Sequence, residues 1–247
     1  MSLNKILGKI RKADIDYGLI DNNDKIAVGI SGGKDSMVLL YALNTYKKIA
    51  KKYDNKDFDI LGIHLDMGFE NMDFSLVKDF FIKNNIQYYD IPTKIYEILK
   101  LNKNEDDSLS CSLCSKLKKG AVIQEAIKLS CNKTAFAHHS DDAVETLLLN
   151  AIYGGRLSTF SPKMYLTNTK MTFIRPFVYV SEKEITNTIN KFDIPTVKST
   201  CPMDGYTKRQ DIKDLLNNLY NNYPMAKSNF VKMLHNEEQL DLWKKKR

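Results

Sequence analysis

The stretch IAVGISGGKDSMVLL, residues 26–40, decides the fold of this chain. It begins as an apolar run typical of a buried strand, passes through two glycines, and becomes apolar at helical spacing. A strand that ends at glycines and continues as a helix brings free backbone N–H groups to the positive end of the helix dipole, which favours an anion. The sequence therefore predicts a phosphate-binding loop at residues 31–36.

This loop is not a Walker A loop. Counting back from Gly33, Val28 occupies a position that the Walker A pattern requires to be glycine, and Asp35 follows Lys34 where serine or threonine is required. The phosphate loop is of another kind.

Beyond the loop, apolar runs alternate with segments of helical period. This alternation predicts an α/β fold, a doubly wound parallel sheet with helices on both faces and with N- and C-terminal helices. Ligands of such a sheet bind beyond the carboxyl ends of its strands. The expected strands are 25–30, 59–66, 86–91, 134–138 and 171–174, and the expected helices are 3–17, 36–53, 73–84, 114–129, 141–153, 182–192, 208–220 and 226–243.

The 247 residues suit a single domain, 1–247, with an N-terminal helical arm at 1–22 and a C-terminal helical extension at 207–247. No apolar run approaches a membrane span and no signal peptide is recognisable, so we expect a cytoplasmic protein with no membrane partner. The net charge of +7 leaves two interpretations open, a solvated basic surface or a polyanionic partner such as nucleic acid. Basic residues gather near the N-terminus, at 116–119 and at 244–247.

Four cysteines in a chain of this length do not indicate a disulfide framework. Cys111 and Cys114 form a CxxC pair, which by itself could be a redox pair, half of a zinc site or an anchor for an iron–sulfur cluster. A zinc ribbon needs a second CxxC, which the sequence lacks, and a thioredoxin-type pair would lie near the first βαβ unit. Cys131 closes an expected helix and is predicted to be a buried structural thiol.

Two further segments place polar residues at strand ends. In IHLDMGF, residues 63–69, His64 and Asp66 either line a nucleotide pocket or are ordinary polar residues at a strand exit. In AFAHHSDDAVETLLLNAIYGGR, residues 135–156, Asp141 and Asp142 suit the first turn of a helix, so simple capping explains them. Capping does not explain the histidines at 138 and 139, which either shape the site or bind a metal.

The hexapeptide SGGKDS resembles the PP-loop of the N-type ATP pyrophosphatases, which cleave ATP between its α- and β-phosphates. The resemblance implies a Rossmann-like PP-loop ATPase fold in which Lys34 neutralises phosphate charge and Asp35 helps to hold Mg²⁺. The ATP-binding residues implied are Ser31, Gly32, Gly33, Lys34, Asp35, Ser36, His64, Asp66, His138 and Asp142.

The runs HHSDDAVETLLLNAIYGG and CSLCSKLKKG also resemble the signatures of the TtcA family, the tRNA 2-thiocytidine synthetases. That resemblance implies that Asp141 and Asp142 face ATP and Mg²⁺. It also implies that Cys111, Cys114 and a late cysteine, here Cys201, bind a [4Fe-4S] cluster. Many relatives carry another cysteine where this chain has Lys198, which leaves Cys201 as the third ligand. The expected catalytic set is Lys34, Asp35, Lys119 and Asp141.

The resemblance implies an ATP-dependent tRNA thiolase that adenylates C2 of an anticodon-loop pyrimidine, cytidine first among them, and replaces its oxygen with sulfur. Three cysteine ligands would leave one iron of the cluster open to sulfur. Expected partners are tRNA, held by the basic termini, a sulfide or persulfide donor such as a cysteine desulfurase, and a second copy in a homodimer. Two alternatives are a lysidine-synthetase-like tRNA-modifying enzyme and a non-catalytic metal or cluster protein that binds RNA.

Overall fold

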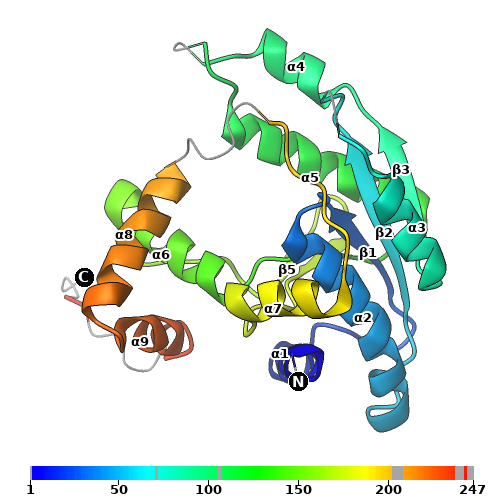
Figure 1. Cartoon of the computed structure of the whole chain (residues 1–247), viewed down its shortest axis with the longest axis horizontal. Helices are drawn as coiled ribbons and strands as arrows, with labels where there is room; N and C mark the ends of the chain where they lie inside the picture. The colour runs from blue at the N-terminus through cyan, green and yellow to red at the C-terminus, as the bar shows by residue number, and fades with distance from the viewer. Residues whose placement is uncertain (1, 70–71, 105–106, 202–207, 237–241, 244–247) are drawn as a thin grey trace. The chain divides into compact units, whose positions relative to one another are not determined.

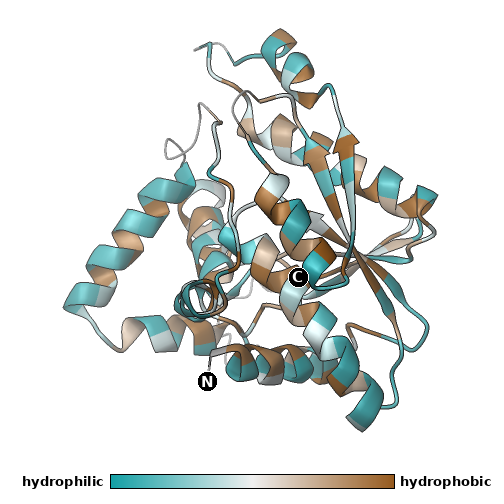
Figure 2. Ribbon diagram, turned by 45° about the vertical axis from the view of Figure 1, so that its right-hand side comes forward, coloured by the Kyte–Doolittle hydropathy of each residue, from teal (hydrophilic) through white to brown (hydrophobic). Residues whose placement is uncertain are grey.

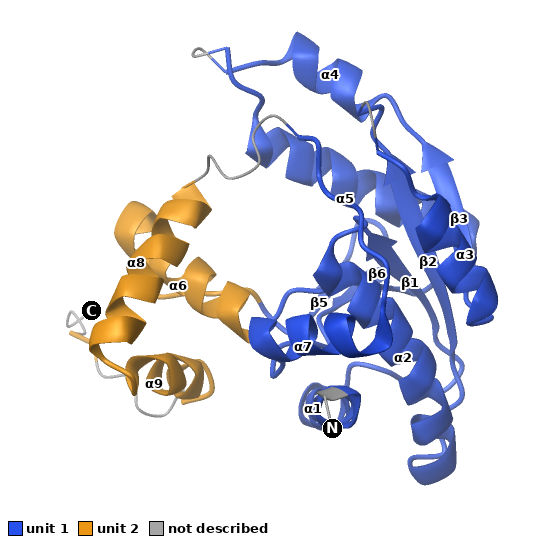
Figure 3. Ribbon diagram, viewed as in Figure 1, with its two compact units in different colours: residues 1–139, 161–205 blue, residues 140–160, 206–247 orange. Residues whose placement is uncertain are grey.

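The computed structural model describes residues 2–69, 72–104, 107–201, 208–236 and 242–243. It divides into two compact units, residues 1–139 with 161–205 (unit 1) and residues 140–160 with 206–247 (unit 2) (Figure 3). The elements are, in chain order, α1 Ser2–Tyr17, β1 Lys25–Ile30, α2 Lys34–Tyr53, β2 Asp59–Asp66, α3 Ser75–Lys83, β3 Gln87–Pro92, α4 Ile95–Leu101, α5 Cys111–Lys128, β4 Lys133–Ala135, α6 Ser140–Gly154, β5 Lys163–Leu166, β6 Met171–Ile174, α7 Glu182–Phe192, α8 Lys208–Asn222 and α9 Ala226–Met233.

Unit 1 contains the sheet, with strands in the order β3-β2-β1-β4-β6-β5. All neighbouring pairs are parallel except the last, since β5 pairs antiparallel with β6. The prediction of a parallel α/β sheet is therefore confirmed except at this edge. β1 lies at the centre, with Lys25 opposite Asp59 and Ile30 opposite His64 on β2. The phosphate loop thus follows a strand that is hydrogen-bonded on both sides.

The two faces of the sheet pack against different helices. On β2, Leu61 and Ile63 point to one face, into a core cluster with Val122 and Ile123 of α5. Between them, Gly62 points to the other face, where a Cβ would lie 2.6 Å from a side-chain carbon of Leu40 on α2. Figure 1 shows α5 and α2 on either side of the strands, and Figure 2 shows apolar residues concentrated in the sheet. The doubly wound arrangement follows from this alternation.

Local capping sets several helix boundaries. Helix α5 begins at Cys111, three residues before its expected start, because the Ser110 hydroxyl accepts a hydrogen bond from Leu113 N–H. Helix α7 has a reciprocal capping box between Ser181 and Glu184. The Ser110 cap thus places Cys111 inside the first turn of α5, together with Cys114, rather than in the loop before it.

Some sequence expectations were wrong in detail. Strand β5 and helix α4 were not expected, and β4 ends at Ala135 rather than at residue 138. The final helix, expected to reach residue 243, ends at Met233, where His235 and Asn236 donate tight hydrogen bonds to carbonyls three residues back. Residues 237–241 of that expectation lie outside the described residues.

Unit 2 has its own apolar centre. Val144 of α6 packs with Ile212 and Leu216 of α8, and Phe230 of α9 contributes from one side. None of the helices in the described part of the chain combines the length and the apolar character needed to cross a membrane.

Candidate active site

The phosphate loop makes a sharp turn between β1 and α2. Gly32 has a φ of +81°, which a residue with a side chain rarely adopts. A Cβ at Gly32 would lie 2.8 Å from Phe74 Cζ and 3.0 Å from Val197 Cβ. The Gly32 carbonyl also accepts a hydrogen bond of 2.9 Å from Val197 N–H. Glycine is thus required here by both conformation and space.

The serines of the loop hold it closed. Ser31 N–H donates to Ser36 Oγ at 3.2 Å, and Ser36 Oγ donates to the Gly33 carbonyl at 3.0 Å. Gly33, the N-cap of α2, supplies no side-chain acceptor to the helix. The first N–H groups of α2 therefore keep their donor capacity for an anion at the loop.

Two carboxylates contact the lysine of the loop. Lys34 Nζ lies 3.0 Å from Asp35 Oδ1 and 3.0 Å from Glu182 Oε1, at the start of α7. Burial disfavours the charged lysine, but Asp35 and Glu182 outweigh it and hold the pKa of Lys34 above its ordinary value. The imidazole of His139 is buried, with Nε2 4.0 Å from Asp35 Oδ1. Four charged or titratable groups from three segments thus meet at the loop.

His64 lies beside the same loop at the end of β2. Its ring stacks on Phe74 with centroids 3.7 Å apart, and Phe74 is the side chain that crowds Gly32. Nδ1 lies 2.8 Å from Asp90 Oδ1 on β3, and Lys78 contacts the other oxygen of that carboxylate at 2.6 Å. Burial lowers the pKa of His64 below 6.5, although Asp90 opposes the shift. His64 is therefore held as a neutral ring near the loop at pH 7.

Two other predicted nucleotide residues lie at the ends of their strands in unit 1. The exposed Asp66 carboxylate accepts a hydrogen bond from Gly68 N–H at 2.9 Å, and its carbonyl accepts one from the Thr93 hydroxyl. His138 is half-buried beyond β4, with its ring 6.2 Å from that of Phe136. Asp66 shapes the turn after β2 through both of these bonds.

The three cysteines assigned to a cluster all lie in unit 1. Burial raises the pKa of the Cys114 thiol, and the negative charges of Cys201 and Cys111 raise it further, while Lys118 lowers it. Cys111 and Cys201 thus both act electrostatically on the Cys114 thiol. Cys131 is separate: it is buried in the core behind α5, and burial raises its pKa to about 11. All four cysteines are free thiols in the structure.

No ready-made metal site is present in the part of the chain that the structure describes. Within it, no three histidine, cysteine, aspartate or glutamate side chains are grouped closely enough to hold a metal ion. Nothing described therefore supports His138 and His139 as metal ligands, and the cysteine ligand set stays a prediction.

The acidic pair Asp141 and Asp142 belongs to unit 2, where cations already contact it. Asp141 Oδ1 lies 2.6 Å from Lys227 Nζ on α9. Arg209 of α8 contacts Asp142 at 3.2 Å and Glu145 at 3.7 Å. Both aspartates are in the first turn of α6, where the helix dipole also favours negative charge.

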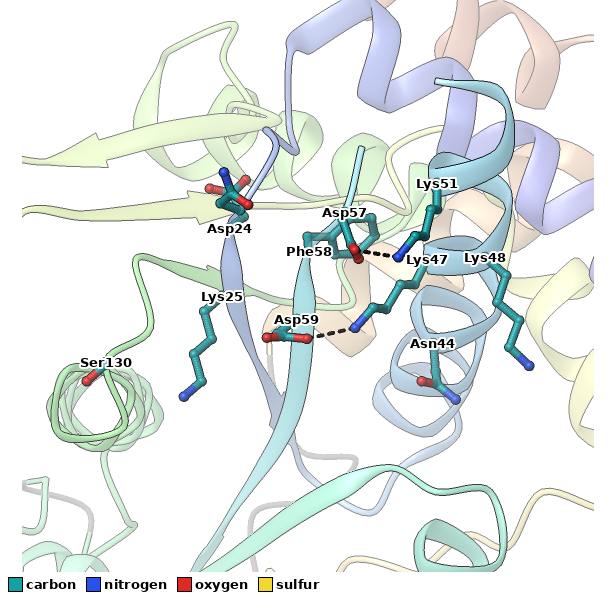
Figure 4. A pocket seen from close by; sticks show the side chains of 11 residues that line it. Asp24, Lys25, Asn44, Lys47, Lys48, Lys51, Asp57, Phe58, Asp59 and Ser130 are labelled. Atoms are coloured by element: carbon teal, nitrogen blue, oxygen red, sulfur yellow. Dashed lines mark hydrogen bonds and ion pairs between the residues drawn. The ribbon is translucent and has the colours of Figure 1, made fainter. Parts of the chain in front are cut away.

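A second concentration of charge lies on the opposite side of the sheet, where the amino ends of β1 and β2 meet; we call this side the amino edge and the side of the phosphate loop the carboxyl edge. A hollow of roughly 700 Å³ is lined there mainly by lysines and aspartates. Figure 4 shows two of the lysines paired, Lys47 with Asp59 at 2.7 Å and Lys51 with Asp57 at 2.6 Å, while Lys25 and Lys48 extend without a drawn partner. The lining residues are Asn23, Asp24, Lys25, Asn44, Lys47, Lys48, Lys51, Asp57, Phe58, Asp59 and Ser130.

Comparison with known proteins gives one consistent answer. Residues 3–218 match the PP-loop domain family. The chain is 38% identical to the tRNA-cytidine(32) 2-sulfurtransferase of Pelobacter propionicus, over 92% of this chain and 83% of that protein. It is 35% identical to the enzyme of the same name from Geotalea daltonii, over 98% of this chain and 95% of that protein. This chain belongs to the tRNA-cytidine(32) 2-sulfurtransferase family.

The fold agrees with this family. The U34-tRNA thiolase NcsA from Methanococcus maripaludis, solved with its [4Fe-4S] cluster, superposes with a TM-score of 0.73 at 24% identity, over 97% of this chain and 80% of that one. The PP-loop ATPase fold expected from SGGKDS is thereby confirmed. In this family member the loop is the ATP-binding PP-loop.

Two neighbours of the PP-loop were not singled out from the sequence. Glu182 contacts Lys34 across about 150 residues of chain, and Phe74 stacks on His64. His139, which the sequence did single out, approaches Asp35. A signal existed for Glu182, since it stands at the acidic start of a helix in SEKEI. The basic residues 244–247, expected to bind tRNA, lie outside the described residues. Lys119 is half-exposed on α5.

Proposed function

We propose that this chain is an ATP-dependent tRNA-cytidine(32) 2-sulfurtransferase that replaces the C2 oxygen of its target cytidine with sulfur. The carrying observation is the combination of a PP-loop with three cysteines in one unit, in a chain 38% identical to enzymes of that name. Binding alone would have no use for the PP-loop, and a lysidine synthetase would have no use for three cysteines.

The PP-loop residues act on the phosphates of ATP. The N–H groups at the start of α2 and the Lys34 ammonium bind the pyrophosphate that departs when the C2 oxygen attacks the α-phosphorus. Glu182 and Asp35 hold that ammonium in place through contacts of 3.0 Å each. Adenylation converts the C2 oxygen into part of AMP, which leaves readily when sulfur attacks C2.

Mg²⁺ fits Asp35. Its Oδ1 is buried and accepts no hydrogen bond from the described residues, although the Lys34 ammonium lies 3.0 Å away, so a carboxylate oxygen of the kind that hard cations prefer stands at the loop. From the family resemblance we also propose that Asp141 and Asp142, in the first turn of α6, face ATP and Mg²⁺. In the structure, Lys227 neutralises Asp141 and Arg209 neutralises Asp142, so Mg²⁺ would have to displace these two cations.

A [4Fe-4S] cluster fits the donor chemistry of Cys111, Cys114 and Cys201. Thiolates are the ligands that such clusters take, and all three cysteines belong to unit 1. When bound, the cluster supplies an iron position open to sulfur, because three cysteines leave one iron without a protein ligand. Cys111, Cys114 and Cys201 would hold the cluster, and Cys131 would take no part in the reaction.

The remaining assignments concern Lys119 and the partners. We assign Lys119 a role in charge stabilisation at the target base. We further propose that the sulfur comes from a sulfide or persulfide donor such as a cysteine desulfurase, that the enzyme works as a homodimer, and that it acts in the cytoplasm, where tRNA is found.

The test is anaerobic thiolation of tRNA in vitro. Cluster-reconstituted protein is incubated with ATP, Mg²⁺, sulfide and unmodified tRNA that carries cytidine at position 32, and digested nucleosides are identified by mass spectrometry. We expect 2-thiocytidine that depends on ATP, and none with tRNA in which uridine replaces that cytidine. Lysidine formation, or tRNA binding without ATP cleavage, would favour one of the two alternatives instead.

A further inference from the structure

An aromatic and basic surface lies where α4 meets the exit of β2. The rings of Phe69 and Tyr96 have centroids 4.7 Å apart at 52°, and both side chains are partly exposed. Lys100 Nζ lies 4.3 Å from the centroid of the Tyr96 ring. Tyr96 N–H donates to the Met67 carbonyl at 3.2 Å, which ties α4 to the segment after β2. The pair of rings is therefore held by backbone as well as side-chain contacts.

This surface is carried rigidly beside the CxxC pair. Helix α4 follows the carboxyl end of β3, and its buried residues Ile95 and Leu99 belong to the core cluster against which Leu113 and Cys114 pack. Figure 3 shows α4 and α5 within the same unit, joined by the segment that leads into Cys111. A molecule on α4 would thus be presented close to the first turn of α5.

Basic residues outnumber acidic ones around the rings. Lys94 and Lys100 on α4, together with Lys116 on α5, are exposed, and Glu97 is an exposed carboxylate between the two lysines of α4. Lys103 is paired with Asp107 at 2.8 Å. The arrangement combines exposed cations with partly exposed rings, and the apolar side chain of Leu101 beside them is 86% exposed.

We propose that Phe69, Lys94, Tyr96, Lys100 and Lys116, the α4 surface, bind the single-stranded loop of the RNA substrate. This inference rests on the proposed function, since it places the RNA loop beside the cysteines. An unstacked base stacks on the Phe69–Tyr96 pair, and the lysines contact the phosphates on either side of it. Stacking on aromatic rings next to a basic track is how single strands are held without sequence preference.

The chemistry favours a single-stranded loop over a duplex. A duplex keeps its bases stacked on one another, so it would contact the lysines but leave the rings unused. A loop with splayed bases uses both. The Lys100 ammonium lies 4.3 Å from the centroid of the Tyr96 ring. A nucleotide whose base stacks on the ring pair could therefore place its own phosphate near that ammonium.

The experiment measures binding of a synthetic RNA hairpin with a single-stranded loop to the full chain by fluorescence anisotropy over a range of salt. Tyr96→Ala should weaken binding about tenfold, and Tyr96→Phe, which keeps the ring, should bind like the unchanged protein. Lys100→Ala should reduce the slope of log affinity against log salt by about 0.7. The matched control, Lys48→Ala on the exposed amino-edge side of α2, should leave affinity and slope unchanged.

The outcomes separate this inference from the proposed function. If the unchanged protein thiolates tRNA and Tyr96→Ala binds the hairpin as well as the unchanged protein does, the proposed RNA binding by the α4 surface is wrong and the proposed function stands. If the unchanged protein fails to thiolate but Tyr96→Ala still weakens hairpin binding, the surface stands without the function. Loss of binding to a sulfur-donor protein in Tyr96→Ala, with hairpin binding intact, would overturn the RNA assignment in favour of a protein partner.

Discussion

The two edges of the sheet in unit 1 carry the same kinds of residue in different arrangements. At the amino edge, Lys47 and Lys51 each pair with one aspartate, and Asp59 of the first pair is 72% exposed. At the carboxyl edge, Lys34 is one-third exposed and is shared by Asp35 and Glu182. Exposed single pairs contribute little beyond solubility. A shared, half-buried lysine next to free helix N–H groups is a binding site.

The cysteines divide in the same way. Helix α5 is 18 residues long, about 27 Å at the usual rise. It runs from the carboxyl ends of the strands to their amino ends. Cys111 and Cys114 occupy its first turn, where the thiols influence one another. Cys131 lies just past its end, near the hollow of the amino edge, in an apolar site. The cysteines that we propose as cluster ligands and the buried Cys131 thus lie at opposite ends of the same helix.

The largest effect should come from the cysteines. Serine is a poor ligand for iron, so Cys111→Ser, Cys114→Ser and Cys201→Ser should each lose the reconstituted cluster and all thiolation, with ATP binding retained. Cys131→Ser should keep both, with a loss of stability of about 1–3 kcal/mol from a buried hydroxyl. Iron content, the visible spectrum and thermal unfolding measure this. Loss of iron in Cys131→Ser would contradict the assignment of Cys131 as a structural thiol separate from the cluster ligands.

Lysines at the two edges should differ next. Lys34→Ala and Asp35→Ala should slow pyrophosphate release about a hundredfold to a thousandfold, because each removes a preorganised charge. Lys47→Ala at the amino edge should release pyrophosphate at the normal rate. A colorimetric phosphate assay with pyrophosphatase measures all three variants, and wild-type rates in Lys34→Ala would show that the loop does not act on ATP.

Two glycines with nearly equal backbone angles isolate the crowding at the loop. Gly32 and Gly68 have φ values of +81° and +79°, but a Cβ meets Phe74 only at Gly32 and no atom within 4 Å at Gly68. Gly68→Ala should cost about 1 kcal/mol of unfolding free energy from backbone strain. Gly32→Ala should cost about 1–3 kcal/mol more from crowding and should weaken ATP binding. Equal losses in chemical denaturation would contradict the proposed crowding.

A smaller effect should depend on pH. Because burial keeps the folded-state pKa of His64 below 6.5, the unfolded chain takes up a proton first as the pH falls. The contribution of neutral His64 is fully present above pH 6.5 and is lost as the pH falls through the folded-state pKa. His64→Gln should therefore flatten the fall in unfolding temperature as the pH drops below 6.5. An unaltered profile would show that His64 does not titrate on unfolding.

The smallest effect belongs to the ion pairs of the amino edge. Lys47→Ala and Lys51→Ala should each leave the free energy of unfolding almost unchanged, since both pairs are exposed to water and salt. Urea denaturation at low and high salt measures this. A loss of several kcal/mol would mean that these pairs resemble the shared lysine at the other edge.

Local signals allowed much of the fold to be predicted. The bounds of β1, β2, β6 and α7 agree with expectation, because glycines, caps and apolar runs mark them in the sequence itself. Helix α4 was missed because it is short, and its buried face consists of Ile95 and Leu99 alone. Strand β5 was missed because its residues are mostly exposed and it gains its pairing only from β6.

The site was predictable only where motif and geometry coincide. The PP-loop residues 31–36 are consecutive, so the motif can be recognised in the sequence alone. The contacts that Glu182 and Phe74 make with the loop and with His64 depend on how distant segments pack, which no local pattern encodes. The charges that Lys227 and Arg209 place on the acidic pair are likewise a product of helix packing within unit 2.

The interleaved division of the chain has a consequence for synthesis on the ribosome. Unit 1 needs residues 161–205, yet residues 140–160 of unit 2 emerge before them. Helix α6 must therefore wait, with Val144 and Leu148 lacking their α8 and α9 neighbours, until the last forty or so residues have been made. A chain stopped at residue 205 would hold a complete unit 1 and an orphaned amphipathic helix. Translation pauses before α8 would expose that helix to chaperones or to other chains.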